Sequence, residues 1–146
     1  MTLIWSDEFS VGVEAIDADH MALFSFYNEL GQAVHSGAGF DVISEKLDFL
    51  GYYCISHFSR EEDIMNELDY PDLPSHTAAH DALQAKFLEL LAEYKTSRAD
   101  ADAERMYLFV GEWLSNHILG DDMRAGAHIR RRLTQQAPCA PQDWPA

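Results

Sequence analysis

Apolar side chains recur at three- and four-residue steps along four stretches of the chain, and polar residues fill the positions between them. This spacing places the apolar side chains on one face of an α-helix. Pro71 and Pro74 separate the second stretch from the third, because proline cannot continue the helical hydrogen-bond ladder. The sequence therefore predicts four amphipathic helices, over about residues 17–36, 41–68, 75–95 and 102–119.

Helices of about twenty residues with short connections bury their apolar faces most simply by packing side by side. We therefore expect an all-α fold, an antiparallel up-down four-helix bundle, in a single domain 1–146 with its core at about residues 5–130. Residues 1–16 have no clear period and mix large apolar residues with acids, so we expect an ordered N-terminal arm laid over the core. Gly120 marks a break, a short C-terminal segment follows it, and residues 133–146 are expected to form a loose tail.

Length and composition restrict the class of protein. A chain of 146 residues with 47% hydrophobic and 24% charged residues fits one globular domain with a sizeable core. The net charge of -15 argues against nucleic acid or an anionic membrane as a partner. Two cysteines offer no disulfide framework, and Asp7 and Glu8 stand where a signal peptide would carry its apolar run. No apolar stretch reaches membrane-spanning length, so we expect a cytoplasmic protein without membrane insertion. The sequence leaves the oligomeric state open, with a monomer favoured.

Each predicted helix also carries metal-type donors on its apolar face. They are His20, His57, Glu61, His76, His80, His117 and Asp122. A buried polar group without a partner costs on the order of 1 to 3 kcal/mol, and a bound metal removes that cost. Seven donors exceed the needs of one tetrahedral zinc but suit two six-coordinate ions if both carboxylates bridge. Imidazole and carboxylate without thiolate favour iron or manganese.

The donor spacings differ between helices. His57 and Glu61 are four residues apart, which separates them by only about 40° around a helix. His117 and Asp122 are five apart, which separates them by about 140°, so both cannot face inward from a regular α-helix. A widened turn or a helix end near Gly120 would bring Asp122 back to the site.

The order and spacing of these donors resemble a known family. His20, His57-x-x-x-Glu61, His76-x-x-x-His80 and His117-x-x-x-x-Asp122 look like the complete ligand set of the hemerythrins. The resemblance covers roughly residues 5 to 130 and extends to Val11-Gly12-Val13, Tyr70-Pro71 and Trp113-Leu114. It implies a hemerythrin-like cation-binding domain of the bacterial kind.

The resemblance also implies a function and a role for each donor. The cofactor would be two iron ions per chain, joined by an oxo or hydroxo bridge. By the family's pattern His76, His80 and His117 would hold one iron and His20 and His57 the other, with Glu61 and Asp122 bridging both. Dioxygen would bind reversibly at the two-histidine iron as hydroperoxide, for storage, transport or delivery.

Several residues outside the seven donors are expected in other roles. Phe58, Leu114 and Ile118 are candidates for an apolar dioxygen pocket, or are ordinary core. Glu62 and Asp121, next to proposed ligands, are expected to be solvated or to support a ligand. His35 and His128 lie outside the pattern and are expected at the surface, and Cys54 is expected to be a buried, inert thiol.

Two classes of function remain open. The first is a dioxygen-binding protein that serves storage or delivery to an oxygen-consuming enzyme, or that senses oxygen through a separate partner. The second is a di-iron enzyme with ferroxidase, peroxidase or nitric-oxide chemistry, whose fold typically uses Glu-x-x-His on two helices. No glutamate of this chain has a histidine three residues later, which favours the binding protein over the enzyme.

Overall fold

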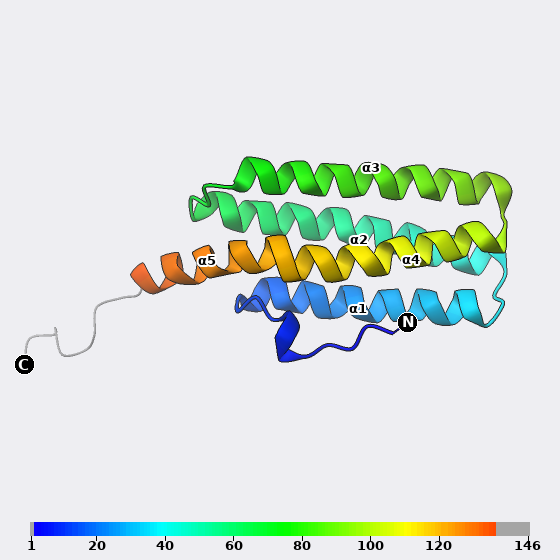
Figure 1. Cartoon of the computed structure of the whole chain (residues 1–146), viewed down its shortest axis with the longest axis horizontal. Helices are drawn as coiled ribbons and strands as arrows, with labels where there is room; N and C mark the ends of the chain where they lie inside the picture. The colour runs from blue at the N-terminus through cyan, green and yellow to red at the C-terminus, as the bar shows by residue number, and fades with distance from the viewer. Residues whose placement is uncertain (1, 137–146) are drawn as a thin grey trace, which may run out of the picture.

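The protein is a bundle of long helices, described in a computed structural model over residues 2–136. Figure 1 shows α1 to α4 side by side along their lengths, with α5 continuing the line of α4. Neighbours in sequence are neighbours in space, since α1 packs on α2 and α4, and α3 packs on the same two helices. The elements are η1 (Asp7–Phe9), α1 (Glu14–His35), α2 (Phe40–Glu67), α3 (Leu73–Ser97), α4 (Asp100–His117), η2 (Ile118–Asp122) and α5 (Met123–Gln135). The predicted all-α, antiparallel four-helix bundle is confirmed.

Tight turns join the helices at sharply defined residues. Gly37, between α1 and α2, has a φ of 77°, which glycine adopts without a steric penalty. Asp69 and Arg98 also adopt left-handed backbone conformations, at the ends of α2 and α3. Pro74 lies in the first turn of α3, where its missing N–H is not needed by the helix, so α3 begins slightly before the expected Ser75.

The N-terminal arm is ordered, as expected, and polar contacts anchor it to α1. The backbone N–H and C=O of Leu3 pair with the Asn28 side chain at 2.9 and 2.7 Å. Asp17 accepts hydrogen bonds from the Ser10 hydroxyl at 2.6 Å and the Val11 N–H at 2.8 Å. The helix was expected to begin at about residue 17, but α1 already begins at Glu14. Asp17 therefore lies inside the helix, where its side chain holds the arm against the first turn.

The fourth helix does not break at Gly120. A π-helical turn, η2, joins α4 to α5 without interruption, so the widened turn is the correct one of the two expected solutions. Helix α5 then runs to Gln135, past residue 133 where the loose tail was expected to begin. The rest of that expected tail, residues 137–146, lies outside the described residues.

Two apolar clusters divide the interior along the bundle axis. The larger cluster fills the centre and the end where α1 meets α2, and includes Tyr27 stacked on Tyr107 with ring centroids 4.6 Å apart. The smaller cluster joins the arm, the first turn of α1, the end of α2 and α5. Along each of α1, α2 and the α4–α5 line, the predicted donors lie between residues of the two clusters. No helix in residues 2–136 is long and apolar enough to cross a membrane.

Candidate metal centre

All seven predicted donors converge in the layer between the two apolar clusters. Each is at most 6% exposed, although each is polar or charged. One atom from each residue can be chosen so that two groups form, with all atoms in a group within 4.8 Å of one another. The groups are Glu61, His76, His80, His117 and Asp122, and His20, His57, Glu61 and Asp122. The two carboxylates belong to both groups, so the cluster has two adjacent centres that share Glu61 and Asp122.

The imidazoles point their Nε2 atoms at the shared carboxylates. His57 Nε2 lies 2.5 Å from one Glu61 oxygen, and His76 Nε2 lies 3.3 Å from the other. Asp122 has the Nε2 atoms of His20, His76 and His117 within 3.1 Å of its two oxygens. The Nε2 atoms of His80 and His117 are 3.0 Å apart and converge on a common point. This is the arrangement in which neutral imidazoles offer their lone pairs to a cation.

The π-helical turn decides which of two adjacent aspartates enters the cluster. On a regular helix the five-residue step from His117 would rotate Asp122 away by about 140°, whereas η2 widens the turn and returns it to the centre. Asp122 is buried, and its neighbour Asp121 stays outside and contacts His117 Nδ1 at 3.1 Å. A single widened turn therefore gives the two aspartates different positions, one inside the cluster and one behind it.

The donor set fits a metal. Both oxygens of Glu61, both oxygens of Asp122 and both ring nitrogens of His20 are buried without a hydrogen-bond partner in the part of the chain that the structure describes. Each such atom costs on the order of 1 to 3 kcal/mol. Cations at the two centres would satisfy these atoms together. The donors are imidazole and carboxylate, without a thiolate among them, a set suited to iron, manganese or zinc.

The protonation of the metal-free cluster follows from burial and from its carboxylates. Burial, aided by the nearby His117 and His76, lowers the pKa of His80 to about 2 and keeps that imidazole neutral. Burial also opposes the charged form of His57 and His76, but the carboxylates close to each ring outweigh it and raise the pKa of each to about 9. Asp122 is buried too, yet the three imidazoles around it, His20, His76 and His117, hold its pKa well below the usual range. The nearby carboxylates therefore favour protons on the cluster imidazoles, at positions that a metal would take.

Sequence reasoning missed the residue behind His57. Asp19 of α1 accepts from His57 Nδ1 at 2.9 Å and also binds Arg60 and Tyr53 of α2. Nothing in the spacing of α1 marks Asp19, because its partners lie on another helix. The matching contact of Asp121 with His117 is different, since the four-residue step between them is visible in the sequence.

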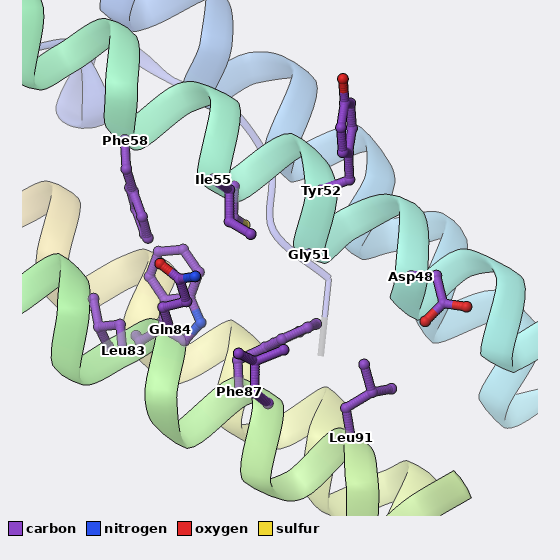
Figure 2. Close-up of a pocket in the computed structure, with 12 residues that line it drawn as sticks. Asp48, Gly51, Tyr52, Ile55, Phe58, Leu83, Gln84, Phe87 and Leu91 are labelled. Atoms are coloured by element: carbon purple, nitrogen blue, oxygen red, sulfur yellow. The ribbon is translucent and has the colours of Figure 1, made fainter.

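The three predicted wall residues are buried in the larger apolar cluster. Phe58 stacks on His80 with ring centroids 3.9 Å apart and planes at 9°, and Leu114 and Ile118 belong to the same cluster. Phe58 also lines a cavity of about 260 Å³ that is formed mainly by α2 and α3. Figure 2 shows Phe58 and Ile55 from α2 facing Leu83 and other apolar side chains of α3 across this cavity. One face of the cluster is therefore closed by an aromatic ring.

The remaining singled-out residues have separate positions. His35 is exposed, as expected, and contacts Glu104 at 3.0 Å. His128 was expected at the surface, which is wrong, since it is half-buried and its Nε2 donates to the Leu68 carbonyl at 2.8 Å near the end of α2. Glu62 has an oxygen 3.7 Å from His80 Nδ1, too far for a hydrogen bond. Cys54 is buried, and burial raises the pKa of its thiol to about 12.

Comparisons with known proteins agree with this geometry. The family model described as the hemerythrin HHE cation binding domain matches residues 11–128. A bacteriohemerythrin of Stenotrophomonas maltophilia is 32% identical over 140 residues, which cover 92% of this chain and 86% of that protein. A hemerythrin-like protein of Naegleria gruberi is 34% identical over 120 residues, covering 82% of this chain and 87% of the other.

The fold comparison extends the likeness to three dimensions. The crystal structure of a wild-type hemerythrin superposes with a TM-score of 0.79 at 29% identity and covers 88% of this chain and 98% of its own. That four-helix fold, the matched domain model and the buried histidine and carboxylate cluster all lead to the same family. This chain belongs to the hemerythrin family.

Proposed function

We propose that this protein binds dioxygen reversibly at a pair of iron ions. The observation that carries the proposal is the pair of overlapping donor groups, in which two buried carboxylates belong to both. A lone metal site would leave part of this set without a partner, at a cost of on the order of 1 to 3 kcal/mol for each atom. The names of the relatives, bacteriohemerythrin and hemerythrin-like protein, favour the same function.

The proposed roles follow the two donor groups. His76, His80 and His117 would hold one iron, and His20 and His57 the other. Glu61 and Asp122, common to both groups, would bridge the two ions. The centre with two imidazoles has fewer protein donors than the other, so it is the proposed position for dioxygen.

The residues around the centre favour binding over oxidative chemistry. When bound, an iron pair supplies the two electrons that dioxygen takes up reversibly. Glu61 and Asp122 bring only two negative charges, and neutral imidazoles stabilise high oxidation states less than carboxylates do. Phe58 stacks on His80 and would exclude water from that face of the centre. Leu114 and Ile118, which pack in the same apolar cluster as Phe58, are the other proposed wall residues.

Adding and removing air tests the proposal. The metal-free protein is loaded with ferrous iron under argon, exposed to air, and purged with argon again while its visible spectrum is followed. Charge-transfer bands that appear in air and disappear under argon over repeated cycles are the expected result. Prompt, one-way oxidation with release of peroxide would contradict reversible binding and favour the di-iron enzyme.

The shared carboxylates provide a second test. Glu61→Ala removes oxygens from both donor groups, so we expect fewer than two iron ions per chain by metal analysis. Glu62→Ala is the matched control, because the neighbouring Glu62 lies 3.7 Å from His80 and belongs to neither group. Two irons per chain in Glu61→Ala would exclude a bridging role for Glu61.

Three further expectations stay predictions. They are a cytoplasmic location, a monomeric state and an oxygen-consuming enzyme as the recipient of dioxygen. Sensing would need a separate partner that reads the state of the metal pair. Storage and delivery differ in whether such a recipient accelerates dioxygen release, which a rapid-mixing measurement with a candidate oxygenase or oxidase would test.

A further inference from the structure

Two of the five cluster imidazoles have a carboxylate within hydrogen-bond distance of Nδ1, on the side that faces away from the metal positions, and each of these carboxylates is itself paired with an arginine. Behind His57 stand Asp19 and Arg60. Behind His117 stand Asp121 and Arg124. The two sets come from different helices, since the first joins α1 to α2 and the second lies within η2 and α5.

Asp19 is the more fully engaged of the two carboxylates. Its Oδ2 accepts from His57 Nδ1 and from Arg60 Nε, both at 2.9 Å. Its Oδ1 accepts from Arg60 Nη2 and from the Tyr53 hydroxyl, again at 2.9 Å each. Four hydrogen bonds and two points of contact with one guanidinium hold the carboxylate in a single orientation. It therefore fixes both the ring plane of His57 and the nitrogen that carries the proton.

The proton position follows from the other edge of the ring. His57 Nε2 lies 2.5 Å from Glu61 inside the cluster, so Nε2 is the nitrogen available to a metal and Nδ1 is the one that donates to Asp19. A carboxylate in this place draws the Nδ1 proton toward itself and makes the imidazole a stronger donor to the metal. The guanidinium of Arg60 opposes that effect, because it neutralises the carboxylate.

We propose that the Asp19–Arg60 pair sets the redox equilibrium of the iron that His57 would hold, with Asp19 as a positioning residue and Arg60 as the group that limits its charge. The inference rests on the iron pair of the proposed function. A more negative Asp19 strengthens the donation of His57 and stabilises oxidised iron, whereas a neutral residue at 19 stabilises reduced iron. The pair thereby adjusts how readily the centre loses electrons without itself touching the metal.

Burial makes this pair the stronger of the two. The Asp19 side chain is 13% exposed, against 34% for Asp121, and Arg60 is 49% exposed against 65% for Arg124. Solvent screens the second pair more, so its charges act more weakly on the metal. The chain therefore contains its own matched comparison, with the same residue types behind a second cluster imidazole.

Substitutions with opposite expected signs test the proposal. Arg60→Gln leaves Asp19 uncompensated, so the oxidation equilibrium of the iron pair shifts up to about tenfold toward the oxidised state, which is about 59 mV for one electron. Asp19→Asn removes the charge and shifts it in the opposite direction. Tyr53→Phe removes one donor to Asp19 and gives a smaller shift with the sign of Arg60→Gln. Spectroelectrochemical titration of the iron-loaded variants measures all three.

Controls separate this route from a general effect of charge. Arg124→Gln gives a smaller shift than Arg60→Gln. Lys95→Gln gives no shift, because Lys95 pairs with Asp48 away from the cluster. Lys95 is fifteen residues, or roughly 22 Å, after His80 on α3. In the double variant Asp19→Asn, Arg60→Gln, the effect of Arg60 disappears because the group it acts through is gone. An undiminished Arg60 effect in that background would overturn the proposal, as would equal signs for the two single variants.

A measurement with zinc distinguishes this inference from the proposed function. Zinc-loaded protein labelled with ¹⁵N shows the His57 Nδ1 proton as a slowly exchanging resonance, which Asp19→Ala shifts or exposes to solvent exchange. Zinc release into a chelator is also about 10- to 100-fold faster in Asp19→Ala, the usual effect of removing the partner of a ligand histidine. Both results are independent of dioxygen. An unchanged resonance and release rate would refute the positioning role even if dioxygen binding is reversible.

Discussion

The interior of this bundle contains two regions that are equally buried and chemically opposite. The apolar region, toward the end where α1 meets α2, consists of large side chains that are 0% exposed, namely Tyr27, Leu30, Leu47, Leu50, Met106 and Val110. The donor layer, next to it along the same helices, consists of five imidazoles and two carboxylates. Burial stabilises the first region and costs free energy in the second. The difference indicates that the fold depends on the apolar region, while the donor layer reaches its full stability only with a cation.

Metal loading is expected to have the largest effect on the free energy of unfolding, because bound cations give partners to the donors whose burial otherwise costs free energy. Iron or zinc at about a thousand times its dissociation constant raises the free energy of unfolding by about 4 kcal/mol relative to metal-free protein. Urea titration with and without metal measures the difference. His80→Ala should remove most of it, whereas His35→Ala, which changes an exposed histidine outside the cluster, should leave it intact. Equal stability with and without metal would contradict the contrast between the two regions.

A core substitution tests the other side of the contrast. Leu47→Ala removes a fully buried side chain from the apolar region, and we expect it to lower the free energy of unfolding by about 3 kcal/mol. The loss should be the same for the metal-free and the loaded protein, and the metal content should stay unchanged. A fall in metal content would mean that packing in the apolar region positions the donors.

The two regions also differ in how their stability depends on pH. Without metal, the folded pKa of His57 and of His76 is raised to about 9, above the ordinary value of 6.5. A raised histidine pKa contributes stability fully below about pH 6.5, and this contribution is lost as the pH rises through about 9. Each of these shifts is worth about 3 kcal/mol, and because both histidines depend on Glu61 the two contributions do not add in full. We expect the metal-free protein to lose on the order of 3 kcal/mol across that window.

Bound metal should abolish this loss, because it occupies the nitrogens that otherwise carry the protons. Urea titrations at pH 6, 7.5 and 9, with and without metal, compare the two states. Leu47→Ala should show the same pH dependence as the unmodified chain, since leucine does not titrate. A metal-free protein that becomes more stable over this range would contradict the assignment of raised pKa values.

Sequence reasoning identified the four helices and the seven cluster residues for related physical reasons. Helical periodicity is a local property, and donors at four-residue steps, such as His76 and His80, stand out on an apolar face. The five-residue step to Asp122 showed that a regular helix could not satisfy it and left a widened turn or a helix end as the two solutions, of which the widened turn is found. The choice of Asp122 over its neighbour Asp121 came from the family resemblance and not from spacing. Helix boundaries were less accurate. Helix α1 starts at Glu14 because Asp17 serves the arm, a contact that periodicity does not encode.

The residues that were missed depend on how helices sit against one another. Asp19 meets His57 and Arg60 only because α1 and α2 pack in one particular rotation, and the sequence of either helix leaves that rotation open. The same holds for His128, whose partner is the carbonyl of Leu68 at the end of α2, 60 residues earlier in the chain. Asp121 differs because its partner His117 is one turn away on the same helix, within reach of a spacing argument.

The smallest expected effect concerns the thiol that lies closest in sequence to the donor layer. Cys54 is one turn before His57, but it belongs to the larger apolar cluster, and burial raises the pKa of its thiol to about 12. We expect Cys54→Ala to cost about 1 kcal/mol, with unchanged metal content and spectrum. In a Cys139→Ala background, which leaves Cys54 as the one thiol, the folded protein should react with a thiol reagent only as fast as it unfolds. Rapid labelling, or loss of metal in Cys54→Ala, would assign this residue to the donor layer instead of the apolar region.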